Sequence, residues 1–398
     1  MNASISPVPV SRMPPARESI GARARHLAPR RALVLLASAL GLVVPALASA
    51  DAASDGIAHA RAQIDKHRAK PVFTAPGAPF DAQKCAAGKK MLSIPNSSAN
   101  PFLKGIIKRE IEVGKQLGLT VQEWQNQGQP NQWAQGVEFA VRNKFDIVNL
   151  ISGVDPKTLE PQIRAAKAAG VRTMTSHFYD PSQPQNPLVA ASLPVGFNAI
   201  GKLLADWAIL RSNGTAHIVV IKSSEVPPTE PLMRGLRDEL AAHCPKCKIV
   251  NEINVGVTEW ATKIQPSLQS ALLANPTVDW VIPIYDSMSQ FVVPAIQITG
   301  RKGKVKVATF NGTPFVLDYV RAGSVDMNIG ESLDWIAHAT IDGYLRALCG
   351  LPVPKDIGVP FYIFDAGNVK DAGVPAQFDQ GYGSDYVAGF RKLWGLSK

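Results

Sequence analysis

Residues 146–176 read DIVNLISGVDPKTLEPQIRAAKAAGVRTMTS, and this stretch decides the fold. It begins with the apolar run Asp146–Ile151, continues with helical periodicity over Pro156–Ala169, and ends with a second run, Val171–Thr175. Gly170 stands between the helix and the second strand, where a left-handed C-cap residue is favoured. A strand, a helix and a strand in this order predict a βαβ unit with two parallel strands.

The same alternation extends from this unit in both directions. Further strands are predicted at Met91–Ile94, Thr120–Trp124, Ala216–Ile221, Ile249–Asn254, Trp280–Ile284 and Lys304–Phe310. Helices are predicted between them, at Asn198–Leu210, Pro231–Ala242, Ala261–Ala274 and Gln290–Thr299. Gly214 again precedes a strand. The two halves each read as a doubly wound unit, so we predict an α/β protein with two similar parallel-sheet lobes.

The first 50 residues have the features of a secretory signal peptide. Arg30 and Arg31 precede the apolar run Ala32–Leu47, and Ala48–Ala50 offers a small-residue cleavage site before Asp51. The run is shorter than the ~20 residues that cross a bilayer, although an uncleaved anchor is the alternative. Export by the Sec or the twin-arginine route, and a start at Met1 or at Met13, both stay open. Residues 1–50 are therefore predicted to be removed and the protein to reach the periplasm.

The positive charge of the chain does not indicate a nucleic-acid partner. The formal net charge is +10 for 398 residues, but six arginines and one acidic residue lie within residues 1–50 and account for half of it. The remaining charge is spread thinly, whereas a polyanion-binding protein has a concentrated basic face. Nucleic acid is excluded as a partner on this basis.

The four cysteines are Cys85, Cys244, Cys247 and Cys349. In an oxidising compartment an even number favours disulfides. Cys244 and Cys247 follow a predicted helix, which is the wrong end for a redox-active thiol, and a metal site would need more ligands nearby. A structural disulfide is the preferred interpretation, with a thiol-disulfide oxidoreductase as a distant alternative. Cys85 and Cys349 can then pair with each other, which spacing alone leaves open.

The motifs of common catalytic sites are missing from the sequence. It contains no G-x-S-x-G, no phosphate-binding loop, no H-E-x-x-H and no G-x-G-x-x-G after the first strand, and its seven histidines show no metal-ligand spacing. We therefore expect no enzyme activity, no cofactor and no metal. An exported two-lobed α/β protein of this kind is expected to capture a ligand in the cleft between its lobes.

Several segments resemble the ribose-binding-like type I periplasmic binding proteins of sugar ABC transporters. They are Ser98–Phe102, Gly170–His177, Pro276–Val278 and Phe310–Pro314, in the order and at the spacing of that family between about Lys89 and Asp365. The resemblance implies two lobes joined by a three-crossover hinge, a monomer, and delivery of a sugar or polyol to a membrane permease. It also implies one lobe from 89–195 plus 331–354 and another from 196–330 plus 355–398. Residues 51–88 show no sustained periodicity and are predicted to form an extension before the first lobe.

The resemblance further implies a set of ligand-binding residues. These are Asn100, Phe102, Ser176, His177, Arg234, Trp260, Tyr285, Asp286, Asn311 and Glu331. Ser176 and His177 stand where ribose binders have an Asp–Arg pair, so a ligand other than ribose is expected. Phe102 and Trp260 would stack on the ligand from opposite lobes.

Each of these residues also has an ordinary structural interpretation. Phe102 and Trp260 could be core residues, Asn100 could simply cap a helix, and His177 could be a satisfied surface histidine. A non-sugar solute, such as an aromatic compound or an amine, is the alternative ligand class. A sugar-responsive transcription regulator would need a DNA-binding segment where residues 1–88 instead contain an export leader.

Overall fold

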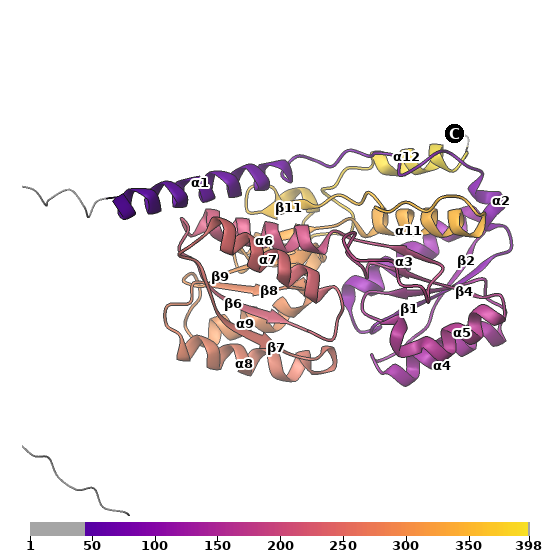
Figure 1. Ribbon diagram of the computed structural model, residues 1–398, viewed down its shortest axis with the longest axis horizontal. Coiled ribbons are helices and arrows are strands. Elements are labelled where there is room, and N and C mark those ends of the chain that lie inside the picture. Colours follow the sequence, from indigo (N-terminus) through magenta and orange to yellow (C-terminus); the bar gives the residue numbers. More distant parts are fainter. Residues whose placement is uncertain (1–43, 397–398) are drawn as a thin grey trace, which may run out of the picture. The chain divides into compact units, whose positions relative to one another are not determined.

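The computed structural model describes residues 44–396, so residues 1–43 of the predicted signal peptide lie outside the described part. Two α/β lobes make up the body of the chain (Figure 1). The first contains a five-stranded, fully parallel sheet in the order β2-β1-β3-β4-β5. Its strands are β1 Lys90–Pro95, β2 Thr120–Glu123, β3 Ile147–Ile151, β4 Arg172–Ser176 and β5 Ala191–Leu193.

The second lobe repeats this strand order and adds one strand. Its sheet runs β11-β10-β9-β8-β6-β7, and only β11 is antiparallel to its neighbour. Without β11 the order is that of the first sheet. In each lobe the strand order reverses between the first and third strands, although these strands are parallel. The strands are β6 His217–Lys222, β7 Lys248–Asn254, β8 Trp280–Pro283, β9 Lys306–Asn311, β10 Met327–Gly330 and β11 Tyr362–Asp365. The predicted doubly wound fold is confirmed.

The helices follow the strands and cover the faces of the sheets. In the first lobe they are α3 Pro101–Leu117, α4 Pro130–Arg142 and α5 Glu160–Ala168. In the second they are α6 Phe197–Arg211, α7 Thr229–His243, α8 Trp260–Ala274, α9 Ser289–Ile298 and α10 Pro314–Arg321. Gly170 and Gly214 have φ values of 82° and 72°, as a left-handed position after a helix requires.

The chain passes between the lobes three times: after β5, after β10, and between α11 (Leu333–Leu348) and β11. Helix α11 packs on α3 of the first lobe, whereas β11 joins the second sheet. Helix α12 (Asp385–Leu393) then packs on α11. Residues 355–398 therefore contribute to both lobes. The predicted three-crossover hinge is confirmed.

The extension before β1 contains two helices that the sequence pattern did not indicate, α1 (Val44–Lys66) and α2 (Ala82–Ala86). Ala60 and Ile64 of α1 are fully buried in the main hydrophobic core. Among residues 44–396, no helix has both the length and the apolar character needed to span a membrane.

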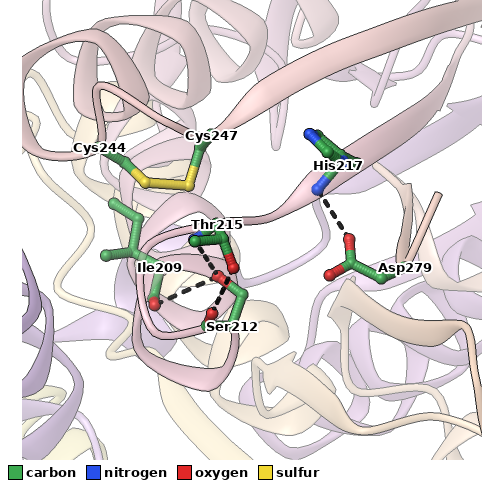
Figure 2. Close-up of a disulfide and its surroundings, with 7 residues drawn as sticks. All are labelled: Ile209, Ser212, Thr215, His217, Cys244, Cys247 and Asp279. Carbon is green, nitrogen blue, oxygen red and sulfur yellow. Dashed lines mark hydrogen bonds between the residues drawn. A yellow bond between two sulfur atoms is a disulfide. The ribbon is translucent and has the colours of Figure 1, made fainter. Parts of the chain in front are cut away.

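Both cysteine pairs form disulfides. Cys85 of α2 is bonded to Cys349 at the end of α11, and Cys244 is bonded to Cys247 immediately after α7. Figure 2 shows the second bond beside the turn of Ser212 and Thr215 that leads into β6. It follows the C-terminus of a helix, where the helix dipole does not stabilise a thiolate, so its surroundings favour a structural role.

Candidate functional site

The two lobes enclose a cavity of about 320 Å³ at the carboxyl ends of their strands. Ligands of doubly wound folds bind at this end of the sheet. The lining comes from both lobes: Asn96, Gly128–Pro130, Trp133, Gly153, Asp155 and Thr158 from the first, and Glu225, Val226, Val257 and Thr258 from the second. The volume lies at the lower end of the range for small-molecule sites, which suits a ligand of monosaccharide size.

The chemistry of this cavity is polar without being basic. Among the described residues that line it, none is lysine or arginine. Asn96 directly follows β1, is 7% exposed, and its Oδ1 has no hydrogen-bond partner among residues 44–396. Trp133 donates from Nε1 to the Asn96 carbonyl at 3.2 Å, which fixes the loop after β1. An uncharged hydroxyl is a suitable partner for such an amide oxygen.

Glycine is required where the lobes meet at this cavity. Gly153 follows β3 with a φ of 103°, and a Cβ there would lie 3.2 Å from Asn96 Nδ2 and 3.2 Å from Val226 of the second lobe. A side chain at Gly153 would therefore press against both lobes at once.

His177 and Glu331 form a buried pair between the first lobe and a crossover. Their Nε2 and Oε2 atoms lie 2.8 Å apart, and both side chains are at most 3% exposed. His177 Nδ1 and Glu331 Oε1 have no hydrogen-bond partner among the described residues. The ring of Phe102 lies 5.1 Å from that of His177, so these three predicted residues do come together.

Trp260 and Tyr285 form a separate aromatic pair in the second lobe. Their rings stack at 6.4 Å, and Trp260 donates from Nε1 to Ser223 Oγ at 2.8 Å. The Tyr285 hydroxyl lies 2.8 Å from Thr229 Oγ1, and burial raises the Tyr285 pKa. Phe102 and Trp260 are 3% and 8% exposed and each contacts its own lobe, so both contribute to the core in this structure.

Asp286 is completely buried and supports the loop after β9. It accepts hydrogen bonds from the Thr313 backbone at 2.6 Å, the Thr313 hydroxyl at 2.7 Å and Asn328 Nδ2 at 3.0 Å. Burial raises the Asp286 pKa to about 6, and these donors oppose the rise. In this arrangement Asp286 positions the loop that follows β9. Asn311 is the last residue of β9, has a φ of 144°, and stands where this loop begins.

Three other predicted residues make different contacts. Asn100 caps α3 by accepting from the backbone of Phe102 at 3.0 Å. Ser176 donates to Asn149 Oδ1 at 2.9 Å inside the first lobe. Arg234 lies on α7, is 43% exposed, and pairs with Glu230 at 2.8 Å. None of the three lines the cavity described above.

The sequence argument missed the residues that do line it. Asn96, Asp155 and Glu225 lie in the loops that follow β1, β3 and β6. Their position at carboxyl ends of parallel strands was the available signal. Asp155 and Glu225 also accept backbone hydrogen bonds from Lys157 and Val257, at 2.9 and 2.7 Å.

Comparison with known proteins agrees with this architecture. The family model described as "Periplasmic binding protein domain" matches residues 92–351. The chain therefore belongs to the periplasmic binding protein domain family. No curated protein matches the sequence.

Solved structures share the fold at low sequence identity. The Caulobacter myo-inositol binding protein, bound to myo-inositol, is 19% identical with a TM-score of 0.63, covering 72% of this chain and 96% of its own. A sugar ABC transporter structure from Yersinia enterocolitica is 16% identical with a TM-score of 0.67, covering 82% and 98%. A periplasmic solute binding protein from Actinobacillus succinogenes with bound D-allose is 19% identical with a TM-score of 0.62, covering 71% and 99%.

Proposed function

We propose that the protein is a periplasmic solute-binding protein, not an enzyme, that captures a small neutral sugar or polyol between its lobes and delivers it to an ABC permease. The observation that carries the proposal is the polar, non-basic cavity at the carboxyl ends of strands from both lobes. Membership of the periplasmic binding protein domain family, and the myo-inositol and D-allose bound by two proteins of the same fold, support it.

The chemistry of the cavity favours a neutral ligand over an anion. Asp155 and Glu225 are the charged groups of its lining, and no lysine or arginine in the described part of that lining would balance a carboxylate or phosphate. Hydroxyl groups can donate to these acids and to Asn96 Oδ1. An amine would also suit the acidic lining, so amines remain the second ligand class.

The test is a binding screen that does not assume the ligand. Thermal-shift measurements with myo-inositol, D-allose, D-ribose, aromatic acids and amines would identify the class, and calorimetric titration would give the affinity. A ligand at 100 times its dissociation constant stabilises the folded state by about 2.7 kcal/mol. Tight binding of an anion would contradict the proposal, and a response to amines alone would replace the sugar with an amine. Tight binding of D-ribose would be consistent with a sugar ligand but would contradict the expectation that the ligand is not ribose.

A matched pair of variants ties the binding to this cavity. Asn96→Ala should weaken binding of the identified ligand about fivefold or more, since one buried hydrogen bond contributes about 1 kcal/mol or more. Asn143→Ala, at the exposed end of α4, removes only a bond to the Phe139 carbonyl and should leave affinity unchanged. Equal affinity in both variants would place the ligand elsewhere.

A further inference from the structure

A second group of chemically active side chains lies outside the cleft, where α1 packs on α7. It consists of His59 on α1 and Glu239 and His243 on α7. His59 Nε2 lies 2.7 Å from Glu239 Oε1, and His243 Nε2 lies 3.6 Å from the same oxygen. One ligand atom from each residue falls within 4.8 Å of the others. The ligand-binding function proposed above makes no use of these residues.

The local structure explains why the three side chains meet. Glu239 and His243 are four residues apart on one helix, so they project from the same face. Helix α1 approaches this end of α7 closely at Gly56, where a Cβ would lie 1.9 Å from the His243 carbonyl oxygen. The buried Ala60 and Ile64 hold the next two turns of α1 against the core.

A buried carboxyl group without a partner faces the cluster. Asp206 on α6 is 1% exposed, and neither of its carboxylate oxygens has a hydrogen-bond partner among the described residues. Its neighbour is the carboxylate of Glu239, itself 5% exposed. Lys202 lies 3.8 Å from Glu239 Oε2. Two buried carboxyl groups that face each other need a shared proton or a bound cation.

The two imidazole rings of the cluster lie face to face. The rings of His59 and His243 stack with centroids 3.7 Å apart and planes 8° apart. Two positively charged rings at this distance would repel each other. Neutral imidazole is the form that binds metal ions.

We propose that His59, Glu239 and His243 bind a divalent transition-metal ion, with Zn²⁺ the best match. Two imidazoles and a carboxylate are a common zinc ligand set, whereas Mg²⁺ and Ca²⁺ prefer oxygen ligands alone. In a tetrahedral site with bonds of about 2.0–2.1 Å, ligand atoms are roughly 3.3 Å apart. The 2.7 and 3.6 Å separations lie on either side of this value, so small side-chain rotations would complete the site.

Such an ion would join segments that are distant in the sequence. His59 belongs to the extension and lies 180 residues before Glu239 of the second lobe. The four cysteines are all in disulfides, so no thiolate competes for the metal. The ion would thus fix the docking of α1 without touching the ligand cavity.

The test is metal binding by the untagged, secreted protein after removal of metals with a chelator. Titration with ZnCl₂ should give one tight site per chain, and Zn²⁺ should raise the melting temperature of the parent. Bound Co²⁺ should give the intense visible absorption of a tetrahedral site. His59→Ala and His243→Ala should each weaken zinc binding at least 100-fold and abolish the melting-temperature shift.

His217→Ala is the matched control, because His217 starts β6 outside the cluster and its ring lies 3.3 Å from the Thr277 carbonyl, a contact that has no part in the proposed site. It should bind zinc like the parent. Glu239→Gln, nearly the same size as the parent residue, keeps the proposal testable if an alanine variant fails to fold. Absence of a site tighter than millimolar in the parent, or equal zinc affinity in the parent, His59→Ala and Glu239→Gln, would overturn the proposal.

Discussion

Glu110 of α3 offers a quantitative test of the buried polar network in the first lobe. It is fully buried, and it accepts hydrogen bonds from Ser93 Oγ at 2.6 Å and from Asn149 Nδ2 at 3.1 Å. Burial raises the Glu110 pKa from 4.5 to about 7, and the two donors oppose the rise. Since a tenfold change in proton affinity is worth about 1.4 kcal/mol, this difference corresponds to about 3 kcal/mol.

The sign of the effect follows from linkage. Below pH 4.5 Glu110 is protonated in both the folded and the unfolded chain, so the favourable contribution of the protonated group is fully present. As the pH rises towards 7 the unfolded chain loses this proton first, and the contribution is lost. Glu110→Gln cannot ionise, and its amide oxygen can still accept a hydrogen bond from Ser93 Oγ or Asn149 Nδ2. The variant should therefore gain about 3 kcal/mol of stability over the parent between pH 4.5 and pH 8.5.

The assay is chemical denaturation of parent and variant at both pH values. At each pH the free energy of unfolding of the parent is subtracted from that of the variant, so titrations that the two proteins share cancel. The prediction concerns how this difference changes with pH. Glu112→Gln is the control, because Glu112 lies on the same helix, is 44% exposed, and pairs with Arg109. Its difference from the parent should stay within about 1 kcal/mol at both pH values. A Glu110→Gln difference that is equal at both pH values would refute the reasoning.

Two further predictions concern the second lobe and the extension. Asp286→Ala should lower the free energy of unfolding by about 3 kcal/mol or more and weaken ligand binding, because it leaves three donors from Thr313 and Asn328 without an acceptor. Asp286→Asn should retain most of the stability and most of the ligand affinity. Equal losses in the two variants would contradict this role. Replacing Cys85 and Cys349 by serine should cost about 2–5 kcal/mol in denaturation experiments, since this bond closes a loop of 264 residues, while replacing Cys244 and Cys247, three residues apart, should cost much less. A larger loss for the second pair would show that loop length does not control the effect.

The sequence predicted most of the sheet architecture because the central parallel strands are buried on both faces and read as apolar runs. Strand β3 is buried at all five positions and was predicted within one residue of its bounds. Strand β5, with three residues, is too short to produce a pattern. Helix α1 was missed because it is stabilised by packing on α6 and α7, which lie far along the chain.

Contacts within the site were less predictable than the fold. The pair of His177 and Glu331 joins residues 154 positions apart, and no local periodicity encodes such a contact. Asp286 was predicted at the end of a strand, where the structure places it, but its burial depends on Thr313 and Asn328 from two other elements. The position of a residue at the end of a strand could thus be predicted from the sequence. The partners that its side chain contacts could not, because they depend on tertiary packing.

The extension has a consequence for the motion of the lobes. It is fixed to the second lobe by Arg68, which pairs with Asp365 at 2.7 Å, and by the His67 carbonyl, which accepts from Ile363 of β11. Only five residues later, Phe73 packs against Trp335 and Phe390 of α11 and α12. Five extended residues span at most about 18 Å, so this segment limits how far its two attachment points can separate. The segment runs beside the third crossover, which joins α11 to β11. When two lobes rotate about a hinge, the parts next to the hinge move least. The extension is therefore compatible with opening of the hinge but limits how far the lobes can open. A metal ion at His59 would strengthen the attachment of the extension to the second lobe without locking the cleft.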